Sequence, residues 1–92
     1  MNLQYFAGKY IWWQPPTVVA NDPHRIIAQV MELATFEDVR ALEAQVGIDA
    51  FKQTLNDARP GEFSARSWHY WHLTLGLAEV AGVPSMPIRR FD

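Results

Sequence analysis

Two histidines three residues apart, His69 and His72, have the spacing that could bind a metal ion. On a helix they would occupy neighbouring positions and could share a ligand. A metal site needs further ligands, usually a third histidine or a carboxylate. The nearest candidates are Glu79, on the side of His72, and His24, at the start of the first expected helix. Because this set is incomplete, helix-surface histidines with hydrogen-bonded or stacked rings explain the spacing better, and we predict no metal or other cofactor.

Nucleophilic catalysis has equally weak support. Ser64 and Ser67 lack a glycine-rich elbow and a histidine placed as a base, and helix capping explains Ser64 better. The chain has no cysteine, phosphate loop or dinucleotide fingerprint. The acids Glu37, Asp38 and Glu43 are expected on a solvated outer helix face. The sequence therefore predicts a protein that is not an enzyme.

Residues 35–59 allow an alternative, a helix-turn-helix that reads DNA. Two short helices would be joined by a tight turn at Gly47, as in that motif. The second helix would present four candidate base and phosphate contacts: Lys52, Gln53, Asn56 and Arg59. However, the first helix carries three acids against Arg40, and the net charge of -2 gives no electrostatic footprint for nucleic acid. A plain helical hairpin is the commoner explanation, so a DNA-binding regulator is the second hypothesis.

Composition predicts one folded domain. The 92 residues are 49% hydrophobic and only 20% charged, with four tryptophans, which argues against disorder and favours an apolar patch for a partner. Residues 1–8 have neither the positive region nor the apolar run of a signal peptide, and no segment has the length of a membrane span. We expect a cytoplasmic protein with no membrane association.

Capping and stop signals predict the helices that must position these side chains. Asp22 precedes Pro23, Thr35 and Asp38 resemble a capping box, and Gly47 supplies a stop. Helices are expected near 23–34, 35–46, 49–59 and 65–76. The predicted fold class is all-α, a small four-helix domain with extended N- and C-terminal arms.

Apolar spacing predicts which helix faces are buried. In the second helix the expected stripe is Phe36, Val39, Leu42 and Val46. In the last helix Trp68, Trp71 and Leu75 form one stripe, expected to pack on Phe36, Phe51 and Leu55. Tyr70, Leu73 and Leu77 form a second stripe on its opposite side. That stripe needs a cover, either the ends of the chain or a partner.

The two ends of the chain are the candidates for that cover. Residues 1–9 show no periodicity and are expected to be a mobile end, so the folded domain would span 10–92. Residues 10–13 form an aromatic arm stopped by two prolines, and residues 83–92 contain two prolines and should be extended. The tryptophans of the first arm are expected to pack on the body, with exposure to a partner as the alternative.

Three parts of the chain supply the candidate partner-binding residues. The set contains the aromatic arm, the second stripe and the C-terminal tail: Trp12, Trp13, Tyr70, Leu73, Leu77, Arg89, Arg90 and Phe91. We expect a protein partner to occupy this surface, with DNA possible but not favoured, and homodimerisation through the last helix is as consistent with the residues as a foreign partner.

Four segments together resemble a known family. They are Tyr10-Ile-Trp-Trp13, residues 25–31 with 35–39, residues 60–64 with 66–72, and Pro87-Ile-Arg-Arg-Phe91. They resemble small bacterial proteins that are often encoded beside nucleotidyltransferase toxins of the abortive-infection (AbiE) type. The resemblance covers residues 10 to 91 and implies an antitoxin-like or accessory role, in which the protein binds and restrains the neighbouring enzyme.

Overall fold

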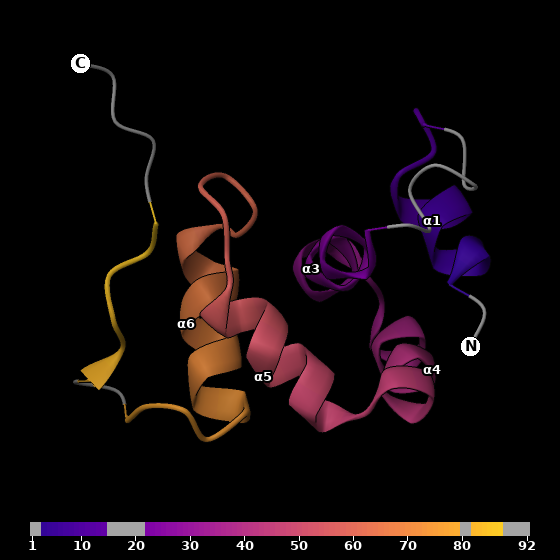
Figure 1. The fold of residues 1–92 in the computed structure, drawn as a ribbon. Coiled ribbons are helices and arrows are strands. Elements are labelled where there is room, and N and C mark those ends of the chain that lie inside the picture. Colours follow the sequence, from indigo (N-terminus) through magenta and orange to yellow (C-terminus); the bar gives the residue numbers. More distant parts are fainter. Residues whose placement is uncertain (1–2, 15–21, 80–81, 88–92) are drawn as a thin grey trace, which may run out of the picture.

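The fold is all-α, as the sequence predicts. A computed structural model of the chain describes residues 3–14, 22–79 and 82–87, and over these ranges it contains five helices and no strand (Figure 1). The helices are α1 (Gln4–Tyr10), α3 (Pro23–Leu33), α4 (Phe36–Val46), α5 (Ile48–Asn56) and α6 (Ala65–Thr74). The four expected helices are confirmed, with boundaries that agree within three residues, and α1 is an additional element.

Helix α3 lies at the centre of the molecule and packs against each of the other four helices. Its buried residues form a broad apolar stripe, whereas Pro23 and Leu33 at its two ends are exposed. The buried set is Ile26, Ile27, Ala28, Val30 and Met31. In Figure 1, α1 and α4 lie on one side of α3, and α5 and α6 lie on the other.

Local capping explains where the helices begin and end. The Asp22 side chain accepts a hydrogen bond from the Arg25 amide (3.3 Å), and Thr35 Oγ1 accepts one from the Asp38 amide (3.3 Å). Gly47 has a φ of 83° and is the only residue between α4 and α5, a conformation that favours glycine. The sharp change of direction between these helices therefore depends on Gly47.

Helix α6 is held by its tryptophans, as its first apolar stripe predicts. Trp71 is buried, stacks edge-to-face on Phe51 at 5.6 Å, and donates from Nε1 to the Met31 carbonyl at 2.8 Å. Trp68 donates from Nε1 to the Pro84 carbonyl at 2.8 Å, which ties the C-terminal segment to α6. Both indole N–H groups are thus buried with a partner, as burial of a polar group requires.

The N-terminal segment differs from the prediction. Residues 4–10 form α1 instead of a mobile end, and residues 11–14 form a turn instead of an extended arm. Leu3, Phe6, Ala7 and Ile11 are buried in the main hydrophobic core, where α1 contacts α3. Helix α1 has no side-chain cap, so the sequence around residues 3–10 contains no capping signal that would predict it. A helix this short depends on packing, here against α3, for its stability.

This packing predicts unequal effects at two phenylalanines. Phe6 is fully buried and Phe36 is 71% exposed. Phe6→Ala should lower the free energy of unfolding by about 3–5 kcal/mol because it opens a cavity between α1 and α3. Phe36→Ala, the matched control, should change it by at most about 0.5 kcal/mol in dilute solution. Urea unfolding followed by circular dichroism measures both, and equal losses would contradict the docking of α1.

Candidate functional site

The tryptophans of the aromatic arm are exposed, contrary to the expectation that they pack on the body. Trp12 is 74% and Trp13 is 51% exposed, and their rings meet edge-to-face at 5.8 Å. Ile11, immediately before them, is completely buried. The two tryptophans therefore directly follow a residue that is buried in the core, and their own rings are exposed.

The turn that carries this pair is fixed at both ends. The Ile11 amide donates to the Ala7 carbonyl (2.9 Å), and the Gln14 amide donates to the Ile11 carbonyl (3.2 Å). Arg25 Nη1 donates to Gln14 Oε1 at 2.6 Å, which joins the turn to α3. These bonds fix the backbone of the turn that carries the aromatic pair relative to the centre of the fold.

Asp38 fixes α1 against α4 and is not the solvated surface acid that we expected. It is buried, and its carboxylate accepts hydrogen bonds from Lys9 Nζ (2.7 Å), Tyr10 OH (2.5 Å) and Tyr5 OH (3.4 Å). The burial of Asp38 could have been predicted only from its three donors on α1, Tyr5, Lys9 and Tyr10. These donors are about thirty residues away in the sequence, so no local pattern connects them to Asp38. Asp38 thus takes part in the cap of α4 through its amide and binds α1 through its side chain.

Charge distribution around Asp38 shifts its pKa and those of its partners. The hydrogen bond from Lys9 and then that from Tyr10 hold the pKa of Asp38 below its usual range. The same contact raises the pKa of Lys9 above its usual range. Burial, followed by the hydrogen bond to Asp38, raises the pKa of Tyr10. The ionised Asp38 with neutral Tyr10 and charged Lys9 is the stable combination at neutral pH.

The second stripe of α6 is divided. Tyr70 is 54% exposed, Leu73 is partly buried, and Leu77 is exposed beyond the end of the helix. Hydrogen bonds from the Leu77 amide to the His72 carbonyl (2.9 Å) and from the Gly76 amide to the Leu73 carbonyl (3.1 Å) form a Schellman motif. This turn separates Leu77 from Tyr70, so the predicted stripe does not form one continuous surface.

Tyr70 instead borders a groove between α4, α5 and α6. Its exposed rim is formed by Phe36, Ile48 and Tyr70, and its floor includes the buried residues Met31, Trp71 and Leu75. The prediction that Phe36 faces the core was wrong, whereas Leu42 of the same stripe is completely buried. Phe36 lies at the edge of that stripe, and its side chain is not covered by α6. We call this feature the α4–α6 groove.

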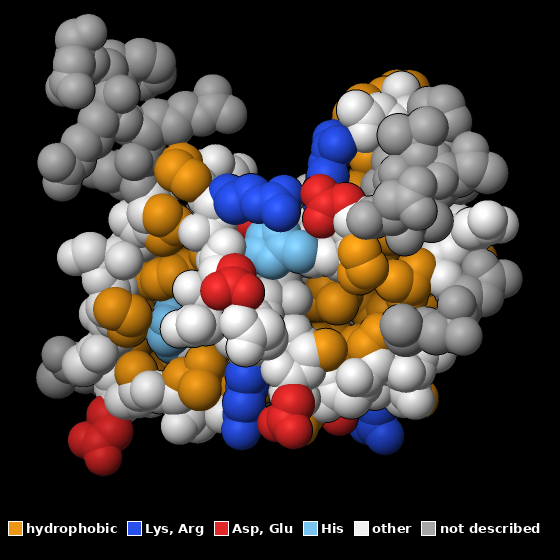
Figure 2. Space-filling view, viewed as in Figure 1, with side chains coloured by type: hydrophobic (Ala, Val, Ile, Leu, Met, Phe, Trp, Pro, Cys, Tyr) orange, Lys and Arg blue, Asp and Glu red, His pale blue; other side chains and the backbone are white. Residues whose placement is uncertain are grey.

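Three of the predicted partner contacts cannot be placed on this surface. Arg89, Arg90 and Phe91 fall outside the described residues. On the face shown in Figure 2, hydrophobic side chains gather over α6 with the C-terminal segment and over the side of α3 and α1, with charged and polar side chains between them. Among the described residues, Trp12 and Trp13 on the turn after α1 and Tyr70 on α6 lie on opposite sides of α3 (Figure 1).

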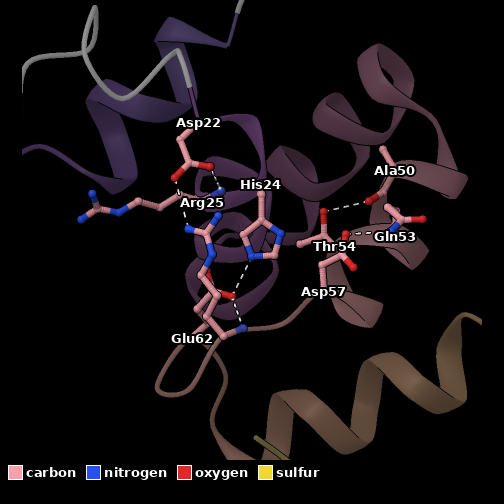
Figure 3. A network of polar contacts seen from close by, with 9 residues as sticks. Asp22, His24, Arg25, Ala50, Gln53, Thr54, Asp57 and Glu62 are labelled. Carbon is pink, nitrogen blue, oxygen red and sulfur yellow. Dashed lines mark hydrogen bonds and ion pairs between the residues drawn. The ribbon is translucent and has the colours of Figure 1, made fainter. Parts of the chain in front are cut away.

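Two of the three histidines, His72 and His24, have structural contacts, and His69 is exposed. His72 is buried against the Trp68 ring at 4.3 Å, and its Nδ1 lies 2.8 Å from the Trp68 carbonyl. Because a carbonyl only accepts, Nδ1 carries the proton. His24 Nε2 lies 2.7 Å from Glu62 Oε1, and Figure 3 shows these side chains pointing toward one another. Within the described ranges, no three histidine or acidic side chains are grouped as a metal site would require.

The DNA-contact candidates are divided between two pockets. Lys52, Gln53 and Asn56 line one pocket together with Asp49 and His72. Arg59 lies in a different pocket, and its Nη1 is 3.2 Å from Asp22 Oδ2. The Arg59 amide also donates to Glu62 Oε1 at 2.7 Å. Arg59 is thus engaged within the fold, which does not favour its use as a phosphate contact.

Comparisons with known proteins found no match among family models, curated proteins or solved structures. The resemblance to the toxin-associated family therefore stays a prediction. In the part of the chain that the structure covers, none of the helices has the length and apolar character needed to cross a bilayer.

Asp38 generates a pH-dependent prediction. Its folded-state pKa is below its unfolded value of about 3.9, so its contribution to stability is present above that pH and is lost as pH falls through the folded pKa. Asp38→Asn should lower stability at pH 7 and weaken the acid dependence below about pH 4. Glu37→Gln, at the exposed neighbouring position, is the control. Urea unfolding across this pH range measures both variants, and an unchanged acid dependence in Asp38→Asn would contradict the assignment.

Proposed function

We propose that this protein is a non-enzymatic binding module whose contact with a partner protein is centred on Trp12 and Trp13. The observation that carries the proposal is the exposure of two adjacent tryptophans on a turn anchored in the core. Large apolar side chains exposed together on a folded protein are a common sign of an interaction site. No catalytic motif in the sequence offers a competing reaction.

Physical chemistry favours these residues as contacts. Tryptophan is enriched among the few residues that dominate protein–protein affinity, because it buries a large area and has an N–H for one hydrogen bond. The hydrogen bonds of Ile11 and Gln14 fix the turn before binding, so less conformational entropy is lost on association. An aromatic pair on a fixed turn can therefore contribute more to affinity than the same pair on a free arm.

The resemblance supplies the candidate partner. It suggests a nucleotidyltransferase toxin encoded beside this gene, which the protein would bind and restrain in the bacterial cytoplasm. The acidic pI of about 5.8 and the Arg59–Asp22 pair support a protein partner over DNA.

Co-expression with the neighbouring gene tests the proposal. If that gene is a toxin, the protein should restore growth and co-purify with it. Trp12→Ala combined with Trp13→Ala should weaken binding by about 30-fold or more, the loss expected for a central contact of at least 2 kcal/mol. Isothermal titration calorimetry with the purified partner measures this change.

Tyr70→Ala is the matched control, because Tyr70 is a similarly exposed aromatic residue on α6, away from the turn. It should leave affinity nearly unchanged. If Tyr70→Ala abolished binding and the double tryptophan variant did not, the contact would lie at the α4–α6 groove and the assignment to Trp12 and Trp13 would be wrong. If the chain neither restored growth nor co-purified with the toxin, the antitoxin-like role would be lost.

A further inference from the structure

The α4–α6 groove is a second apolar surface that the proposed function does not use. Phe36, Ile48 and Tyr70 expose large apolar side chains around a groove of about 290 Å³. That volume lies at the bottom of the roughly 300–1,000 Å³ range of sites for drug-sized ligands, and suits one or two side chains of another protein. Burial of these exposed rings would release apolar surface from water, which favours association.

We propose that a second copy of this chain occupies the groove. The two copies would be related by a twofold axis, with the α4 helices antiparallel. This inference is independent of the partner contact at Trp12 and Trp13, which lies on the turn after α1. A twofold interface must be self-complementary, so each group on one copy needs its partner on the same surface of the other.

The charges on the groove meet this condition. Arg40 and Glu43 both line it and lie three residues apart on α4, on the same helix face as Phe36. If the twofold axis passes midway between positions 40 and 43, each Arg40 faces Glu43 of the second copy. One cation and one anion on each copy then give two equivalent ion pairs. A foreign partner would have to supply the same pattern independently.

The same register also accommodates Phe36. With positions 40 and 43 opposite one another, position 36 lies opposite position 47 of the second copy. Gly47 has no side chain, and a Cβ placed there would have nothing within 4 Å. Ile48, the next residue, is exposed on the rim of the groove. The Phe36 ring of one copy can therefore reach Ile48 and the groove of the other without displacing a side chain at Gly47.

Charge reversal tests both the dimer and its register. Sedimentation velocity over a range of concentrations should give the unmodified chain a mass approaching twice 10.6 kDa. Arg40→Glu and Glu43→Arg should each weaken self-association by about tenfold or more, because like charges then face one another. Mixing the two variants in equal amounts should restore a dimer containing one copy of each. The Arg40→Glu/Glu43→Arg double variant should also dimerise.

Glu37→Arg is the matched control, since it makes the same charge change at an exposed α4 position that does not line the groove. It should leave the mass unchanged, and circular dichroism should show every variant folded. A chain that stays monomeric at all concentrations, or variants that do not associate on mixing, would overturn this inference. If the chain does not dimerise but partner binding still depends on Trp12 and Trp13, only the dimer is disproved and the proposed function stands. If the chain dimerises but partner binding does not depend on these tryptophans, only the proposed function is disproved.

Discussion

Packing of the other four described helices on the buried stripe of α3 is the constraint on which the rest of the structure depends. Each of the other helices packs on it, and its apolar residues supply the shared part of the core. A chain of 92 residues has little apolar surface to spare, so every helix must contribute to that core.

Polar contacts decide how the outer helices are oriented on this core. Asp38 binds the donors of α1, and Glu32 receives the Ser64 hydroxyl and the Ser67 hydroxyl at the start of α6, both at 3.1 Å. Partly buried charges need partners, so these contacts select one arrangement among those that apolar packing would allow. They also leave the exposed aromatic surfaces separate, with Trp12 and Trp13 on the turn after α1 and Phe36 and Tyr70 at the groove.

Local chemistry explains which parts of the fold could be predicted. Thr35, Gly47 and Ser64 form their capping contacts within four residues, so their sequence context already contains their partners. The Phe63–Trp68 contact, with ring centroids 6.0 Å apart, is equally local. In contrast, α1 has no side-chain cap and its Phe6 packs in the common core, so no pattern within residues 3–10 marks it as a helix.

The sequence by itself determined the helical class, the positions of the four main helices and the buried tryptophan face of α6, because periodicity and caps are properties of neighbouring residues. Only the tertiary structure decided that α1 docks, that Asp38 is buried, and that Trp12, Trp13 and Phe36 are exposed. The exposure of a side chain at the edge of an apolar stripe depends on which other helix covers it. That covering is set by contacts between residues far apart in the chain, and a single sequence carries no local record of them.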